Sequence, residues 1–568
     1  MRSPCQPDGA HNLTRGLRKR SPYIGHHISR SPFLPPPPPP THTAHHPLMN
    51  HVATFFALTL FVSSFSCIAA PKPAALFSEH AVLQQGKPVP VWGTANPGEN
   101  IRVSWRDVSA ETITGDDARW RVILPALPSG QSADLIIAGD DSTLTIPDVI
   151  AGDVWLCSGQ SNMVWHVNQA EGGRDDAKTA NFPALRHFKV TRAKSPTPLT
   201  ELEGEWQVAS PKTVRGWSAV AFYFGRALLQ QRGGTPVGLI NTAWSGTDIE
   251  AWISSESIDT SPAGPAVRAR WRELATDYPA RAQKHKTDFA AWEKARAEAE
   301  VAGTLANFKQ RKPRAPVGPG SSSEPSVIFN GEIHPLIPYA LAGMIWYQGE
   351  NNTPRSSEYA ALQRSLIRDW RARWDSPSLP FLYVQLPNYA ASHKPLGTGW
   401  AAFRDEQARV LSEPATGMAI TIDVGESGTV HPVKKREVGE RLALLARAIA
   451  CGEKNVPSSP RLLDAKPDAK NARLRLTFDT GGSPLVLRAA PAAADETTPP
   501  AFQIAGADGV FFPARVTLEG DNTIVLTNPS VTAPLHVRYA WINDPVATLF
   551  NQAGLPAAPF RTDGEMIR

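Results

Sequence analysis

The sequence predicts an α/β protein in which a doubly wound domain is flanked by two β-sandwich domains. In the middle of the chain, short and strongly apolar runs alternate with longer helical patterns, as in a parallel sheet that is covered on both faces. On either side, apolar stretches are separated by turn residues, which is typical of small β-sandwiches. The 568 residues are sufficient for several domains.

The N-terminal region, residues 1–70, predicts a tail and a signal peptide. Six consecutive prolines from Pro35 to Pro40, without any periodic apolar pattern, indicate a disordered tail. The apolar run Val52–Ile68 then has the character of a signal-peptide core. We therefore expect translation to start at Met49, and the exported chain, periplasmic or secreted, to begin near Pro71. The run is short for a membrane span, so we expect no stable membrane insertion, with an anchor helix as the alternative.

The charge balance argues against nucleic acid as a partner. The chain holds 58 Lys and Arg against 53 Asp and Glu, and the excess lies before Met49, which leaves 52 of each sign in the rest. Because the chain from Met49 onward carries no net charge, we expect no general electrostatic attraction to nucleic acid or to an anionic membrane surface. Only Cys157 and Cys451 remain in the mature chain, and the sequence leaves open whether they pair. No Cys/His cluster has metal-ligand spacing, so we predict no metal site.

Three domains follow the tail in this prediction. The first, residues 71–150, is a β-domain with strands near 89–92, 101–105, 120–124 and 135–137. The second, residues 151–452, has buried strands over 236–242, 342–347, 380–386 and 418–424 and helices over 359–374 and 433–450. Its stretch rich in Ala, Arg, Glu and Lys, from Ala266 to Lys312, predicts a helical hairpin within an insert of about 260–325. Residues 453–568 are predicted to form a second β-domain, with strands near 474–478, 524–526 and 535–539.

The chemistry concentrates at strand ends, where open α/β sheets bind their ligands. The segment Asp153–Met163 runs from a strand into a Gly-containing turn, which exposes the Ser161 hydroxyl and directs its backbone N–H at a developing oxyanion. Ser161 is therefore a candidate nucleophile, with a helix N-cap as the alternative role. His431 lies in the loop after strand 418–424 and before a helix, which makes it the candidate base, with a helix cap as the alternative.

These residues belong to blocks that resemble a known family. The blocks are Gly159-Gln-Ser-Asn-Met163, Asn241-Thr-Ala-Trp-Ser-Gly246-Thr247, Trp346-Tyr-Gln-Gly-Glu350 and Asp423-Val-Gly followed by His431-Pro432. In this order they resemble the sialate O-acetylesterase-like carbohydrate esterases of the SGNH hydrolase superfamily. Segments near both ends, residues 81–93 and 537–562, share the resemblance. It implies a flavodoxin-like catalytic domain.

The resemblance also implies roles for individual residues. Ser161 would be the nucleophile, and His431 would act first as general base and then as general acid. The backbone N–H groups of Ser161 and Gly246 would form the oxyanion hole, with the side-chain amide of Gln348 as a further donor. For Gln348 and Glu350 the alternative is a polar strand end that orients the neighbouring loops.

The orienting acid is the point at which this sequence departs from the family. Much of the superfamily carries Asp three residues before the histidine, but Gly428 stands there. Asp423 and Glu426 are the candidates, and we favour Asp423 because a strand end is held more rigidly than a loop. A Ser/His dyad supported by a backbone carbonyl is the alternative.

The implied reaction removes O-acetyl groups from carbohydrates. Ser161 attacks the ester, the sugar hydroxyl leaves, and water releases acetate from an acetyl-serine, without metal or cofactor. Sialic acid and plant or bacterial glycans such as acetylated xyloglucan or xylan all fit as substrates, and the oligomeric state is not indicated. Trp165, Trp244 and Trp252 adjoin the blocks and either stack on sugars or pack in the core.

Two other functions stay open from the sequence. Glu350 ends a strand and would suit a glycoside hydrolase with paired acids, although no partner acid is evident at a comparable strand end. A non-catalytic carbohydrate-binding protein with β-sandwich modules is the second alternative.

Overall fold

The computed structural model describes residues 70–390, 397–489 and 500–564. Its main sheet has the order β10-β9-β11-β8-β12-β13-β14, in which each neighbouring pair is parallel except the edge pair β10-β9. The strands are β8 (Thr143–Gly159), β9 (Phe182–Val190), β10 (Gly204–Ala209), β11 (Val237–Ala243), β12 (Gly343–Tyr347), β13 (Phe381–Val384) and β14 (Thr416–Ala419). The chain is thus a mixed α/β protein, as predicted. The predicted tail, signal peptide and start at Met49 lie outside the described residues.

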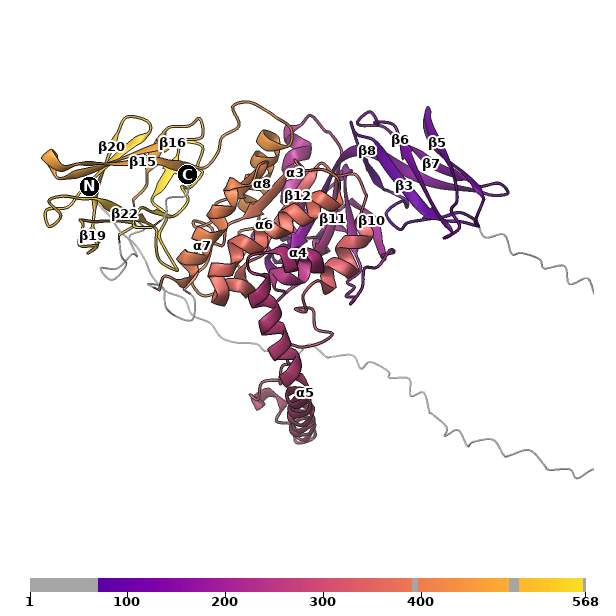
Figure 1. The fold of residues 1–568 in the computed structure, drawn as a ribbon, viewed down its shortest axis with the longest axis horizontal. Helices are drawn as coiled ribbons and strands as arrows, with labels where there is room; N and C mark the ends of the chain where they lie inside the picture. The colour runs from indigo at the N-terminus through magenta and orange to yellow at the C-terminus, as the bar shows by residue number, and fades with distance from the viewer. Residues whose placement is uncertain (1–69, 391–396, 490–499, 565–568) are drawn as a thin grey trace, which may run out of the picture. The chain divides into compact units, whose positions relative to one another are not determined.

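Helices cover both faces of this sheet (Figure 1). On one face, Phe224 of α3 (Ala219–Gln231) meets Trp155 of β8 with ring centroids 5.0 Å apart. Because Trp155 is paired with Gly343, the side chain of Trp346 points to the opposite face. There its ring centroid lies 5.9 Å from that of Trp370 of α6 (Ser356–Arg373). Helix α8 (Arg436–Ile449) packs beside α3, and α7 (Gly399–Arg409) packs beside α6. Cover on both faces explains why the central strands are largely apolar.

The strand that precedes the candidate base ends earlier than predicted. β14 ends at Ala419, because its partner β13 ends at Val384, which is paired with Ala419. Asp423 therefore lies in a turn beyond the strand and not at its end. This corrects the premise on which Asp423 was preferred as the orienting acid.

Both flanking regions consist of strands, as predicted. On the N-terminal side, β1, β3 and β6 form one sheet, while β4, β5 and β7 join the first half of β8. The bounds are β1 (Lys72–Pro73), β2 (Val82–Gln84), β3 (Val89–Thr94), β4 (Asn100–Trp105), β5 (Val108–Ile113), β6 (Arg119–Leu124) and β7 (Ser132–Ala138). The strand β8 continues from this region into the main sheet, because its first half pairs with β7 and its second half with β11 and β12.

The C-terminal strands form three smaller sheets with the orders β15-β16-β21-β20, β17-β23 and β19-β18-β22-β24. Their bounds are β15 (Arg461–Asp468), β16 (Arg473–Asp479), β17 (Leu485–Leu487), β18 (Phe502–Ala505), β19 (Phe512–Pro513), β20 (Arg515–Glu519), β21 (Thr523–Thr527), β22 (His536–Tyr539), β23 (Leu549–Asn551) and β24 (Phe560–Arg561). Strands predicted near 474–478, 524–526 and 535–539 correspond to β16, β21 and β22.

The insert contradicts the predicted helical hairpin. It contains one long helix, α5 (Gly264–Val301), and the chain then returns through the short turn Leu305–Asn307 and an irregular segment (Figure 1). The indole N–H of Trp292 donates to the carbonyl of Gln310 at 3.1 Å, which fastens the returning segment to the helix. A second helix is prevented because residues 313–320 contain three prolines and two glycines.

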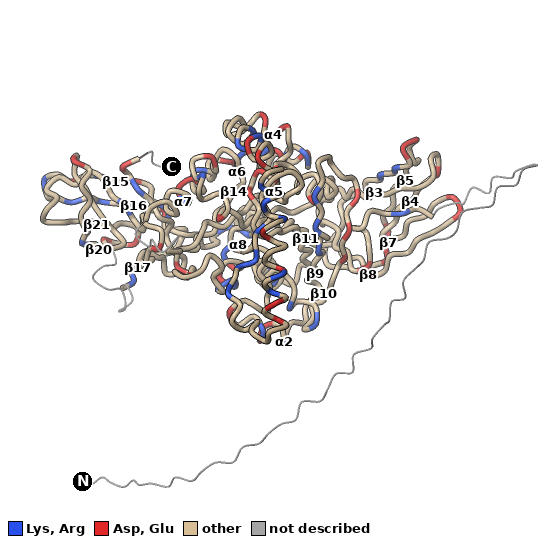
Figure 2. The backbone as a smooth tube through the Cα atoms, turned by 90° about the horizontal axis from the view of Figure 1, so that it is seen from below, with Lys and Arg blue, Asp and Glu red and all other residues tan. Residues whose placement is uncertain are grey.

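Acidic and basic residues are interspersed along the described chain (Figure 2). On α5 they form pairs one turn apart, such as Lys284 with Asp288 at 2.7 Å, and only Gly264 and Val267 of this helix are buried. None of the described helices is both long enough and apolar enough to cross a membrane. Cys157 and Cys451 are both free thiols, which answers the question of pairing.

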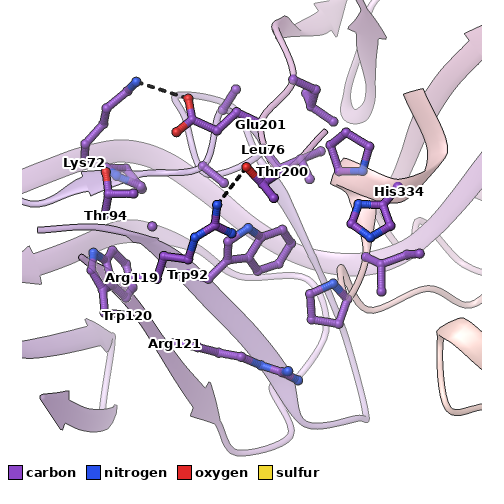
Figure 3. Close-up of a pocket in the computed structure, with 18 of the residues that line it drawn as sticks. Lys72, Leu76, Trp92, Thr94, Arg119, Trp120, Arg121, Thr200, Glu201 and His334 are labelled. Carbon is purple, nitrogen blue, oxygen red and sulfur yellow. Dashed lines mark hydrogen bonds and ion pairs between the residues drawn. The ribbon is translucent and has the colours of Figure 1, made fainter. Parts of the chain in front are cut away.

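A cavity of about 420 Å³ lies beside β3 and β6 (Figure 3). Its rim is bridged by a hydrogen bond from Arg119 to Thr200 at 2.8 Å and by the Lys72–Glu201 ion pair at 3.5 Å. None of the predicted site residues lines it. The cavity is therefore distinct from the site described next.

Candidate active site

Ser161 stands on a tight turn at the carboxyl end of β8. The strand ends at Gly159, and Ser161 is the first residue of the short helix α1 (Ser161–Val164). Gly159 has φ +138°, and a Cβ placed there would lie 2.2 Å from the carbonyl oxygen of Tyr347. Only glycine permits this close approach to β12, so the turn that presents Ser161 depends on it.

His431 contacts Ser161 directly. Its Nε2 lies 2.8 Å from Ser161 Oγ, although the two residues are 270 positions apart in the sequence. The imidazole stacks on the indole of Trp165, with ring centroids 5.3 Å apart and planes 21° apart. Burial lowers the pKa of His431, and the positive charge of Lys435 lowers it further. A neutral imidazole can accept the serine proton, so the pair has the geometry and protonation of a nucleophile and its base.

Neither candidate acid contacts His431. Asp423 accepts two hydrogen bonds from Arg441 of α8, each 2.6 Å long. Glu426 accepts the backbone N–H of Val433 at 2.8 Å. In the described residues no carboxylate is hydrogen-bonded to the imidazole. The structure therefore brings together Ser161 and His431 but not a third, acidic member.

The backbone donors predicted for the oxyanion hole are free, whereas Gln348 is not. No hydrogen bond from the N–H of Ser161 or Gly246 is found within the described chain. Gly246 lies in the turn after β11, and a Cβ there would meet nothing within 4 Å. Gln348 is fully buried, and its amide donates to the carbonyl of Thr247 at 3.2 Å and to Asn352 Oδ1 at 2.7 Å. Both N–H groups of Gln348 are thus engaged, one with the loop that follows β11 and the other with the segment that follows β12.

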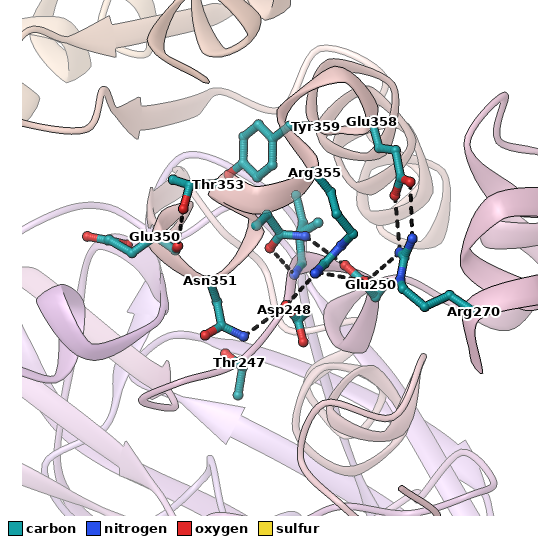
Figure 4. A network of polar contacts seen from close by, with 12 residues as sticks. Thr247, Asp248, Glu250, Arg270, Glu350, Asn351, Thr353, Arg355, Glu358 and Tyr359 are labelled. Carbon is teal, nitrogen blue, oxygen red and sulfur yellow. Dashed lines mark hydrogen bonds and ion pairs between the residues drawn. The ribbon is translucent and has the colours of Figure 1, made fainter. Parts of the chain in front are cut away.

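A polar network fixes that same loop (Figure 4). Arg355 donates to Asp248 at 2.7 Å, and Asn351 donates to the same Asp248 oxygen at 2.8 Å. Glu250 accepts from Asn352 at 2.9 Å and pairs with Arg270 at 3.1 Å. Burial and the charge of Glu250 raise the pKa of Asp248. The network joins the segment after β11 to the one after β12, and thereby holds Gly246 in place.

The comparisons with known proteins agree with the motifs. A family model described as carbohydrate esterase, sialic acid-specific acetylesterase, matches residues 151–266 and 332–447. The sialate O-acetylesterase of Rattus norvegicus is 30% identical over 526 residues, which cover 83% of this chain and 90% of the rat protein. The chain belongs to the sialate O-acetylesterase family of carbohydrate esterases. The resemblance inferred from the blocks is confirmed.

Two further relatives support this assignment. The sialate O-acetylesterase of Mus musculus is 29% identical over 525 residues, covering 83% of this chain and 90% of the mouse protein. A crystal structure of a carbohydrate acetylesterase from Xanthomonas citri is 34% identical, with a TM-score of 0.72. It covers 87% of this chain and 100% of the other chain.

No role was predicted for Asn162 or Lys435. In this member of the sialate O-acetylesterase family both side chains lie next to the Ser161–His431 pair. Asn162 and Lys435 are buried, and Lys435 donates to the side-chain oxygen of Asn162. Glu350 accepts from Asn162, and its other carboxylate oxygen is buried without a hydrogen-bond partner among the described residues. Burial raises the pKa of Glu350. The sequence offered one signal for Lys435, because a lysine only four residues after the candidate base can bring a positive charge close to it.

The three tryptophans near the blocks have different surroundings. Trp252 is fully buried, and its N–H donates to Thr247 Oγ1 at 3.0 Å, so it supports the loop after β11. Trp165 packs on the imidazole, as described above. Trp244 is half-buried, with the guanidinium of Arg192 5.4 Å from its ring centroid.

Proposed function

We propose that the protein is an exported serine esterase that removes O-acetyl groups from carbohydrates through an acetyl-serine intermediate. As a member of this family it is a carbohydrate O-acetylesterase, and the observation that carries the mechanism is the 2.8 Å contact between Ser161 Oγ and His431 Nε2. A hydroxyl within hydrogen-bond reach of a neutral imidazole is the arrangement that an activated serine requires.

The proposed reaction proceeds in two halves. Ser161 Oγ attacks the acetyl carbon while His431 Nε2 takes its proton, and the tetrahedral oxyanion is held by the N–H groups of Ser161 and Gly246. His431 then gives the proton to the departing sugar oxygen. In the second half, His431 takes a proton from a water, which attacks the acetyl carbon. His431 then returns this proton to the departing Ser161 Oγ, and the acetyl group leaves as acetic acid, which ionises to acetate.

We propose that Ser161 and His431 act as a dyad. Asp423 is engaged by Arg441 and Glu426 by the backbone of Val433, so neither is available to orient the imidazole in this conformation. Stacking on Trp165 fixes the plane of the ring instead. The hydrogen bond from the backbone of His431 to Thr429 Oγ1, 3.1 Å long, helps to set the chain direction there.

The strand order supports an SGNH hydrolase domain of the flavodoxin-like type. Without the additional strands β9 and β10, the parallel strands run β11-β8-β12-β13-β14, which in chain order is 2-1-3-4-5. Doubly wound sheets of this order bind ligands at the carboxyl ends of the strands near the first strand. Ser161 follows the first strand, β8, and Gly246 follows β11. Export is proposed from the apolar run Val52–Ile68.

Acetate release from a panel of acetylated glycans tests the function and identifies the substrate. The panel contains O-acetylated sialic acid, acetylated xyloglucan and acetylated xylan. We expect at least one to release acetate, and Ser161→Ala to lower turnover by roughly 10⁴-fold or more with unchanged thermal unfolding. Ser427→Ala, an exposed serine of the His431 loop, is the matched control and should retain activity. Turnover of Ser161→Ala within tenfold of wild type would refute the mechanism.

A further inference from the structure

Lys435 places a buried cation behind the catalytic pair. The residue is 1% exposed and immediately precedes helix α8. Its Nζ lies 5.7 Å from the ring centroid of Trp165 and 5.5 Å from that of Tyr347, and it donates to Asn162 Oδ1. No carboxylate lies within ion-pair distance of Lys435 in the described chain. A buried lysine without a direct ion pair is costly, so it calls for an explanation.

The amide of Asn162 has a single orientation in these surroundings. Its Nδ2 donates to Glu350 Oε1 and to the carbonyl of Val430, the latter at 2.8 Å, while its Oδ1 accepts from Lys435. An ammonium can only donate, whereas a carbonyl and an ionised carboxylate only accept, so the reversed amide would lose all three bonds. Asn162 is completely buried, and both N–H groups of its side-chain amide donate hydrogen bonds.

This amide joins the two segments that carry the catalytic groups. Asn162 follows Ser161 directly, and Val430 precedes His431 directly. The hydrogen bond between them therefore sets how closely the two catalytic side chains approach. Lys435, from the start of α8, holds the oxygen end of the amide and so keeps its donors pointed at Val430 and Glu350.

The charge of Lys435 also acts on His431. Burial lowers the pKa of Lys435 to about 7, while the charges of Glu350 and Glu426 oppose this shift. The pKa of His431 is lowered by burial and then by Lys435. Lys435 is accordingly still charged over the more acidic range in which His431 loses its proton.

We propose that Lys435 is a positioning residue of the esterase, which holds Ser161 and His431 in contact through Asn162 and keeps the imidazole neutral in mildly acidic solution. The proposal rests on the proposed function, because it concerns the same Ser161–His431 pair. A purely structural lysine would affect folding or turnover without changing the pH dependence.

The test is the pH profile of kcat/KM for hydrolysis of 4-nitrophenyl acetate by wild type and Lys435→Met. We expect kcat of Lys435→Met to fall by roughly 10- to 100-fold, because the catalytic pair is held less precisely. We also expect the acidic limb of its kcat/KM profile to move up by about 0.5 pH units or more. Lys434→Met, which removes an exposed neighbouring lysine, should change neither. An unshifted acidic limb in folded Lys435→Met overturns the proposal.

A second variant keeps the test decisive if Lys435→Met does not fold. Lys435→Met leaves Glu350 as an uncompensated buried charge, which can prevent folding. Lys435→Met combined with Glu350→Gln removes both charges, and we expect it to fold and to show the same upward shift of the acidic limb. Ser161→Ala is measured alongside. Activity in Ser161→Ala overturns the proposed function, whereas an inactive Ser161→Ala with an unshifted limb in the double variant overturns only the role of Lys435.

Discussion

Ser161 stands on a turn that is shaped by backbone packing, whereas His431 stands in a loop that is held by side chains. The turn follows directly from β8, and its glycine lies against the backbone of β12. The loop between β14 and α8 has no regular structure, and Asp423, Glu426 and the Asn162 amide fasten it. The proposed nucleophile, Ser161, should therefore be sensitive to backbone changes, and the proposed base, His431, to changes in those side chains.

This difference explains what the carboxylates of the loop do. Paired with Arg441, Asp423 ties the loop to α8, and Glu426 closes the loop on itself at Val433. These hydrogen bonds of both acids stabilise the loop that carries His431 and do not reach its imidazole. A position close to His431 in the sequence therefore does not show that a carboxylate contacts the imidazole.

The largest effect is expected at the glycine of the turn. In Gly159→Ala the new Cβ would lie 2.2 Å from the carbonyl oxygen of Tyr347, at a φ of +138°. Because backbone atoms cannot move aside easily, we expect a stability loss of more than about 3 kcal/mol, with little activity left. Thermal unfolding and acetate release measure both. Gly428→Ala, in the loop where the Cβ meets open space, is the control. Equal tolerance of both changes would contradict the comparison.

The ion pair between Asp423 and Arg441 should contribute more to the stability of the protein than to its turnover. Asp423→Asn weakens the two bonds from Arg441, and we expect the free energy of unfolding to fall by about 2 kcal/mol. We expect kcat to fall less than about tenfold at temperatures well below unfolding. Denaturant unfolding and initial rates check this. A hundredfold loss of kcat with unchanged stability would instead make Asp423 the orienting acid.

The pH dependence of kcat/KM tests the surroundings of His431. His431 must be neutral to accept the serine proton, and its pKa is lowered below the usual 6.5 by burial and by Lys435. We therefore expect kcat/KM to rise with pH below 6.5 and to level off before neutrality. Folding also favours the neutral imidazole, so its contribution to stability is lost as pH falls through that lowered pKa. A kcat/KM profile whose acidic limb is centred above pH 6.5 would contradict the position of His431, which is buried and close to the charge of Lys435.

The smallest effect is expected at Glu426. In Glu426→Gln the side-chain oxygen can still accept the N–H of Val433, so the loop keeps its internal bond. We expect kcat to change by less than about tenfold and the unfolding temperature to change little. Initial rates and a thermal scan measure this. A loss as large as that of Ser161→Ala would show that Glu426 takes part in the reaction in another conformation of the loop.

The sequence by itself determined the mixed α/β character of the protein, its family and the two residues that meet in the site. Apolar runs such as 236–242 and 342–347 could be read as buried strands because burial on both faces leaves few polar positions. Ser161 and His431 could be singled out because each lies where a strand gives way to a turn or loop. The insert was misread as a hairpin because its composition favours helix but does not specify where the chain reverses.

Only the tertiary structure decided how the site is supported. Hydrogen bonds between side chains far apart in sequence depend on exact positions, which periodicity and motif spacing do not encode. Asp423 faces Arg441 rather than His431, and Gln348 turns its amide to Thr247 and Asn352. Lys435 reaches Asn162 across 273 positions of sequence. Burial, which the fold alone creates, then lowers the pKa values of Lys435 and His431, because it disfavours their charged forms.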